Sequence, residues 1–118
     1  MKDKVEEASS LWPAAGMPLP HKRESEMIKH IVVWPMKDDV TDAQKTEMKL
    51  RLEALKNVID ELIDIEVGID DDNDTMSLVS AFNSEADLAA YQSHPAHLDV
   101  VGFVKPLVAG RAVCDYAC

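Results

Sequence analysis

The segment Ile28–Trp34 constrains the fold more than any other part of this chain. Its side chains alternate in direction as in a β-strand, yet both of the resulting faces are largely apolar. One face carries His30 and Val32, and the other carries Ile31 and Val33. A strand that is apolar on both faces has to be covered on both sides. The chain is therefore expected to form a sheet with a packing partner on each face.

An amphipathic helix of about five turns is predicted after this strand, over residues 41–62. Thr41 and Gln44 have the spacing of a capping box at its start. Its charged residues, Lys45 among them, are expected on the solvated side. The apolar stripe that would face the sheet consists of Met48, Leu52, Leu55, Ile59 and Leu62.

A β-hairpin follows the first helix. Alternating apolar residues predict strands over residues 63–69 and 75–82, joined by the acidic loop 70–74. The loop lacks the ligand spacing of known calcium-binding loops. A solvated turn is therefore favoured over a cation site.

Two helices and a last strand complete the chain. The first helix begins near Ser84, and Pro95 pushes the residue before it, His94, away from helical geometry. The second helix would open with Pro95 in its first turn and end with Gly110 as the residue after its C-terminus. Residues 111–117 are predicted to form the last strand.

This order of elements is β-α-β-β-α-β, the ferredoxin-like arrangement of the α+β class. It gives an antiparallel four-stranded sheet with the helices on one face. The other face of the sheet stays uncovered, although the first strand is apolar there too. Two such sheets packed about a twofold axis would form a dimeric α+β barrel. We therefore expect a homodimer joined through the sheet faces.

Residues 27–118 are predicted to form one domain, preceded by an irregular extension over residues 1–26. A formal net charge of −10 argues against nucleic acid or an anionic membrane as partner. No stretch has the features of a signal peptide or of a membrane span, so a cytoplasmic protein is expected. Cys114 and Cys118 are then expected to be reduced thiols.

Tyr91, His94 and His97 form the cluster that looks least like scaffold. His97 would project from the first turn of a helix, where free backbone N–H groups lower a histidine's pKa and favour the neutral base. If His30 faces the helices, it converges with Tyr91 and His97 on a mostly apolar pocket. Alternatively, His94 and His97 only cap or pack the helix, and His30 is a hydrogen-bonded core residue. The other residues expected to line the pocket are Val32, Trp34, His94 and Phe103.

The segments Met27–Trp34 and Tyr91–His97, at this separation and in this topology, resemble the stress-responsive A/B barrel (Dabb) family. The likeness runs from Met27 to about Tyr116 and leaves the N-terminal extension unmatched. It implies a small homodimeric α+β barrel, and most members of the family have no assigned chemistry.

One plant member of that family is a polyketide cyclase that uses no cofactor. Its catalytic pair resembles His97 as the base with Tyr91 as the phenol, and its first-strand histidine corresponds to His30. A further histidine, on its third strand, aligns near Met76 of this chain. The resemblance thus implies a related proton transfer more than the same reaction.

Three functions follow as hypotheses. The first is a dimer that binds a small apolar or aromatic ligand without turnover. The second is a cofactor-independent enzyme of the cyclase or lyase type, with His97, Tyr91 and His30 as catalytic residues. The third is a monooxygenase of the related dimeric barrel families. No cofactor is predicted, and no metal site, because His94 and His97 alone do not fill a coordination shell.

Overall fold

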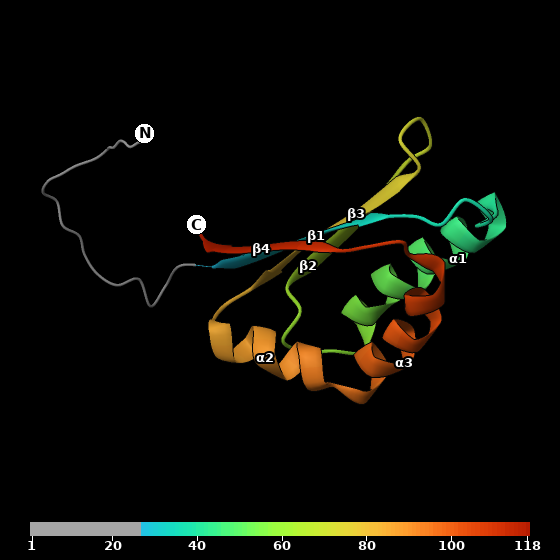
Figure 1. Cartoon of the computed structure of the whole chain (residues 1–118). Coiled ribbons are helices and arrows are strands. Elements are labelled where there is room, and N and C mark those ends of the chain that lie inside the picture. Colours follow the sequence, from blue (N-terminus) through green and yellow to red (C-terminus); the bar gives the residue numbers. More distant parts are fainter. Residues whose placement is uncertain (1–26) are drawn as a thin grey trace, which may run out of the picture.

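The computed structural model describes residues 27–118, so the extension predicted over residues 1–26 lies outside the described residues. The described part is an antiparallel four-stranded sheet with three α-helices on one face (Figure 1). The elements are β1 (Ile28–Pro35), α1 (Asp42–Ala54), β2 (Asp64–Asp70), β3 (Thr75–Phe82), α2 (Glu85–Ser93), α3 (Pro95–Val104) and β4 (Ala112–Ala117), with short 3-10 turns η1 (Leu55–Asn57) and η2 (Lys105–Leu107). The strand order is β2-β3-β1-β4, and the predicted ferredoxin-like fold is confirmed.

Strand β1 lies inside the sheet, with β3 on one side and β4 on the other. His30 and Val32 are buried on the face toward the helices, while Val33 is 37% exposed on the opposite face. The antiparallel register places Ser80 and Asp115 directly opposite His30. Side chains opposite one another in a sheet point to the same face, so this register brings three polar residues together.

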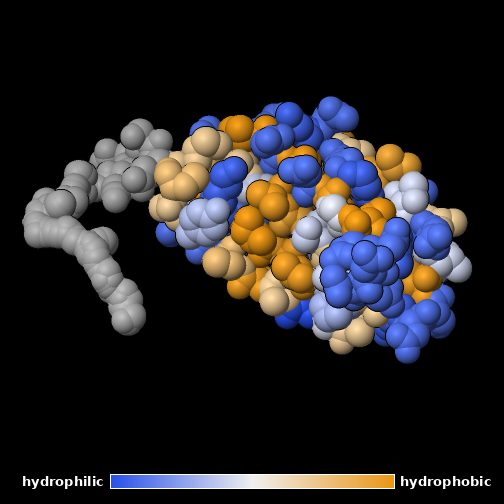
Figure 2. All heavy atoms as spheres, turned by 90° about the horizontal axis from the view of Figure 1, so that it is seen from above, coloured by the Kyte–Doolittle hydropathy of each residue, from blue (hydrophilic) through white to orange (hydrophobic). Residues whose placement is uncertain are grey.

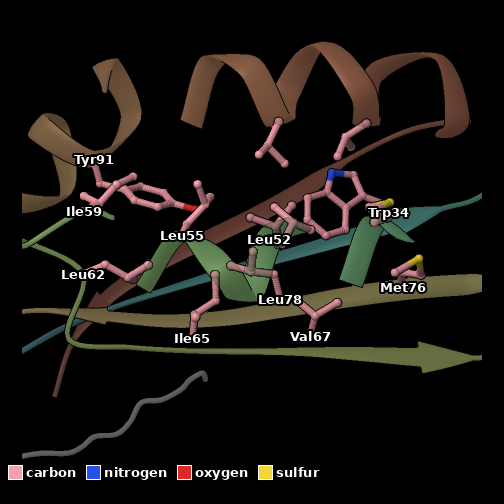
Figure 3. Packing of buried hydrophobic residues seen from close by; sticks show 14 of the residues in the cluster. Trp34, Leu52, Leu55, Ile59, Leu62, Ile65, Val67, Met76, Leu78 and Tyr91 are labelled. Atoms are coloured by element: carbon pink, nitrogen blue, oxygen red, sulfur yellow. The ribbon is translucent and has the colours of Figure 1, made fainter. Parts of the chain in front are cut away.

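The apolar stripe predicted for the first helix is buried against the sheet (Figure 3), but the helix is shorter than predicted. Helix α1 ends at Ala54, and Ile59 and Leu62 reach the core from the connection that follows η1. Asn57 and the β-branched Val58 are weak helix formers, which accounts for the early end.

The start of α1 follows the prediction. The backbone N–H of Gln44 donates to the Thr41 hydroxyl at 3.1 Å, and the backbone N–H of Thr41 donates to the Gln44 side chain at 2.9 Å. The two residues therefore form the expected capping box, which satisfies two N–H groups at the helix N-terminus.

The predicted end of the last helix at Gly110 is wrong. Helix α3 ends at Val104, and η2 continues it only to Leu107. Pro106 cannot donate a backbone hydrogen bond, so it does not extend a helix. Val108 has already left the helix and forms a β-bridge with Met36.

Lys45 was expected on the solvated side of α1, but only 6% of its surface is exposed. The loop between β2 and β3 folds over it, and its ammonium nitrogen lies 2.9 Å from Asp74 and 3.6 Å from Asp71. The hydrogen bond to Asp74 raises the pKa of Lys45 above its ordinary value. The acidic loop is thus partly neutralised by ion pairs with a lysine of the same chain.

The sheet face away from the helices is open. Figure 2 shows this face, with hydrophobic side chains gathered near its centre and hydrophilic ones around them. Ile31 belongs to this face and lies opposite Val79 on β3 and Cys114 on β4. Both Cys114 and Cys118 are free and exposed. Between residues 27 and 118, no helix has the length and apolar character needed to cross a membrane.

Candidate functional site

A cavity of about 310 Å³ lies between the sheet and α3, near the lower end of the range for small-molecule sites. Its floor consists of buried residues from the sheet, α1 and α2, and its mouth of exposed residues that include Gln92 and Leu98. Most of the lining is apolar. The buried residues of the floor are His30, Val32, Trp34, Leu52, Leu78 and Tyr91.

Tyr91 lies in the last turns of α2 and is 1% exposed. Its ring packs between Phe82, at 5.0 Å between ring centroids, and His97, at 4.5 Å. Its hydroxyl is directed into the layer between the sheet and α3 (Figure 3). Burial raises the pKa of Tyr91 to about 12, so the phenol stays protonated at neutral pH. In the described part of the chain this hydroxyl has no hydrogen-bond partner, so it is available as a donor to a ligand.

His97 is the third residue of α3, so it projects from the first turn as predicted. Burial lowers the pKa of His97 below its ordinary value, and the nearby His30, Arg111 and His94 act in the same direction. A hydrogen bond to the Gln92 carbonyl, 3.1 Å from Nδ1, acts in the opposite direction. Because a carbonyl only accepts, Nδ1 carries the proton and Nε2 keeps a free lone pair.

His30 is 4% exposed, and its Nδ1 lies 2.5 Å from a carboxylate oxygen of Asp115. The carboxylate accepts the Nδ1–H, which fixes the ring orientation and leaves Nε2 unoccupied by this bond. The ring centroids of His30 and Tyr91 are 6.5 Å apart in an edge-on arrangement. The structure therefore brings His30, Tyr91 and His97 to one cavity, and Tyr91 lies close to both histidines.

Of the other residues predicted for the pocket, Val32 and Trp34 line the cavity. His94 and Phe103 do not line the cavity, so their assignment to the pocket is wrong. The Nδ1 of His94 accepts the backbone N–H of Ala96 at 3.0 Å, so His94 is the N-cap of α3. The Phe103 ring lies 4.2 Å from the guanidinium carbon of Arg51, in a cation–π contact with α1.

Several residues of the site were not predicted from the sequence. Asp115 holds His30, but their pairing depends on the register between β1 and β4, which no local pattern encodes. Lys105 and Arg111 line the cavity, yet in the sequence they resemble ordinary solvated charges. Among the described residues no cluster of three or more histidine, cysteine, aspartate or glutamate side chains has the geometry of a metal site.

A ferredoxin-like α+β domain with a histidine-lined apolar cavity beneath its helices is the class of protein that this geometry defines. The sequence narrows the class further. The profile of the Stress responsive A/B Barrel Domain family matches residues 28–118, so the chain belongs to this family.

Solved structures with the same fold include two dimeric proteins of unknown function and a hydroxynitrile lyase. A dimeric ferredoxin-like protein from Thermobifida fusca is 28% identical, with a TM-score of 0.71 over 80% of this chain and 92% of that chain. A dimeric protein from Bacteroides fragilis is also 28% identical, with a TM-score of 0.67 over 78% and 96%. A hydroxynitrile lyase from Passiflora edulis is 22% identical, with a TM-score of 0.71 over 80% and 94%. A comparison with curated proteins found no match.

The lowered pKa of His97 gives the first testable prediction. In an NMR titration, we expect the His97 ring to bind its proton below the ordinary value of 6.5, because burial disfavours the charged ring. As the pH falls below the ordinary value, His97 binds its proton in the unfolded chain before it does so in the folded chain. The free energy of unfolding therefore decreases as the pH falls through this range. A His97→Gln variant identifies the resonance, and a midpoint at or above 6.5 would contradict the prediction.

Proposed function

We propose that this protein is a homodimer that binds a small aromatic or apolar carbonyl compound in the cavity beneath its helices. One observation carries the proposal: the Tyr91 hydroxyl is buried in an apolar cavity without a hydrogen-bond partner in residues 27–118. Burying a donor without an acceptor costs about 1–3 kcal/mol. A carbonyl oxygen that accepts from Tyr91 would offset this cost, while its apolar body fills the cavity.

The homodimer is proposed from the open face of the sheet. Ile31 lies near the middle of this face, with Val79 and Cys114 opposite it on the neighbouring strands. A second copy related by a twofold axis presents the same apolar surface, so each sheet can cover the other. The relatives from Thermobifida fusca and Bacteroides fragilis, which share this fold, are dimers.

A second candidate function is cofactor-independent proton transfer, because Tyr91 and His97 are in contact inside the cavity. His97 is neutral at pH 7, and its Nε2 could remove a proton from the carbon next to a bound carbonyl. The carbonyl oxygen then becomes an enolate oxygen and accepts a hydrogen bond from Tyr91. In an aldol step, the enolate carbon attacks a second carbonyl, whose oxygen takes the proton back from His97.

His30 completes this candidate mechanism as a second polar group at the cavity floor. Asp115 holds its ring, so Nε2 is available to interact with the same ligand. The Passiflora edulis lyase is too distant, at 22% identity, to support an activity, so this proposal depends on the geometry alone. The monooxygenase hypothesis stays a prediction, because no contact in the described structure favours it.

Ligand binding is tested by blocking the mouth of the cavity. Leu98 lines the mouth and is 55% exposed, so Leu98→Trp adds bulk there without disturbing the core. Leu50 is 57% exposed on α1 and does not line the cavity, so Leu50→Trp is the matched control. In an amide NMR titration with methyl 4-acetylbenzoate, we expect a Kd of about 1 mM for the wild type and the control.

The Leu98→Trp variant should lose this binding by at least about tenfold, because the added ring occupies the mouth. Equal binding by both variants, or no shift of cavity residues in the wild type, would contradict the ligand-binding proposal.

Proton transfer is tested by hydrogen–deuterium exchange of the acetophenone methyl group in heavy water. The wild type should accelerate this exchange, and His97→Gln should reduce the acceleration by about 100-fold, because general bases contribute about 10²–10⁴-fold. Tyr91→Phe should also reduce it, since the enolate loses its donor. Leu50→Trp should exchange at the wild-type rate. If acetophenone binds but its exchange is not accelerated, the proton-transfer proposal is wrong and the ligand-binding proposal remains.

The homodimer is tested by placing a charge at the centre of the open face. Ile31→Glu should convert the protein to a monomer at micromolar concentration, because an unpaired carboxylate would be buried between the sheets. Val58 is also apolar and is 56% exposed, but it lies in the connection between η1 and β2, so Val58→Glu should remain dimeric. Analytical ultracentrifugation distinguishes the two states, and a monomeric wild type would overturn the proposal.

A further inference from the structure

The mouth of the cavity carries two cations although the protein as a whole is strongly acidic. The formal net charge of the chain is −10, yet the residues lining the cavity include Lys105 and Arg111 and neither an aspartate nor a glutamate. Both cations are exposed, so they lie at the mouth and not at the floor. In an acidic protein, a mouth with two cations and no carboxylate selects for anionic ligands.

These two cations are not engaged elsewhere in the described structure. Within residues 27–118 neither Lys105 nor Arg111 forms an ion pair, whereas Lys45, Lys49 and Arg51 all do. A guanidinium without a carboxylate partner is free to bind an oxyanion through two parallel hydrogen bonds.

Arg111 is also placed to reach a ligand in the cavity. It comes directly before β4, and Ala112 lies opposite Val33 on the open face. Because side chains alternate along a strand, Arg111 points to the face of the sheet that carries Trp34 and the cavity. Arg111 lies close enough to His97 for its charge to contribute to the lowered pKa of that ring.

The floor offers hydrogen-bond donors of a different kind. Tyr91 is 1% exposed and Trp34 is 7% exposed, and neither the hydroxyl nor the indole N–H has an acceptor within the described residues. Figure 3 shows the indole nitrogen of Trp34 on the side of α3. The Tyr91 hydroxyl, a neutral donor deep in the cavity, fits a carbonyl oxygen, and the two cations at the mouth fit an oxyanion.

We propose that the ligand of this cavity is a carbonyl compound that also carries an oxyanion, a carboxylate or a phosphate, held at the mouth by Arg111 and Lys105. The carbonyl end lies inward, at Tyr91, and the apolar body lies between the two ends. This inference rests on the proposed ligand-binding function and adds the charge and the orientation of the ligand. A cavity of about 310 Å³ limits the body to about the size of one substituted ring.

The test compares three probes with the same acetylphenyl body, by amide NMR titration of the full chain. Methyl 4-acetylbenzoate is neutral, 4-acetylbenzoate carries a carboxylate, and 4-acetylphenyl phosphate carries a phosphate. We expect at least one anion to bind about fivefold or more tightly than the neutral ester at low ionic strength. This preference should shrink with added salt, because exposed charges are screened.

Variants assign the preference to the two cations. Arg111→Gln should bring the affinity of the preferred anion down to about that of the neutral ester, and Lys105→Gln should reduce it by a smaller factor. Both changes should weaken the binding of the ester far less than the binding of the preferred anion. Lys56 is exposed and does not line the cavity, so Lys56→Gln removes one positive charge without altering the mouth and should keep the preference.

The outcomes separate this inference from the proposed function. If all three probes bind equally well, the cavity binds carbonyl compounds and the anion proposal is wrong. If the wild type prefers the anions to the ester and the Arg111→Gln and Lys105→Gln variants keep the same preference, the assignment to these residues is wrong. If no probe binds, both the anion proposal and the ligand-binding proposal are overturned. The tighter of the two anions identifies the carboxylate or the phosphate as the recognised group.

Discussion

The double pairing of β1 is the constraint on which the rest of the structure depends. Because β3 and β4 both pair with β1, each of residues 28–33 in this strand has a neighbour on each side. His30 thereby lies between Ser80 and Asp115, and the Asp115 carboxylate holds its ring. The same pairing leaves Ile31 and its neighbours on the far face. One register therefore determines both the polar end of the cavity and the apolar surface of the sheet.

The two faces of the sheet differ in their side chains and in what covers them. Toward the helices, the rings of His30, Tyr91 and His97 interrupt an otherwise apolar layer. The Tyr91 ring lies near both histidine rings. Away from the helices, the sheet carries few polar groups near its centre, which suits a second sheet better than water. A small domain buries a limited share of its surface, so the proposed pairing through this face would also add to its stability.

Local patterns in the sequence were sufficient for most of the fold. The capping box of Thr41 and Gln44 and the break at His94 depend on residues within a few positions of each other, and both were predicted. Contacts between distant segments were not accessible in this way. Asp115 is 85 residues from His30, and the burial of Lys45 depends on a loop that folds back over α1. Short segments of a sequence show periodicity and turn signals. They do not show the register between strands or the course that a loop takes over the rest of the chain.

Strand β4 lies at the edge of the sheet, and all six of its residues are exposed. Hydrogen bonds at such an edge open more readily than those of a covered strand. Since Asp115 belongs to β4, fraying of this C-terminal strand frees the His30 ring while the core stays folded. The orientation of the His30 ring is thus only as well fixed as this edge strand, and amide exchange over residues 112–117 reports how much of the time Asp115 is in place to hold it.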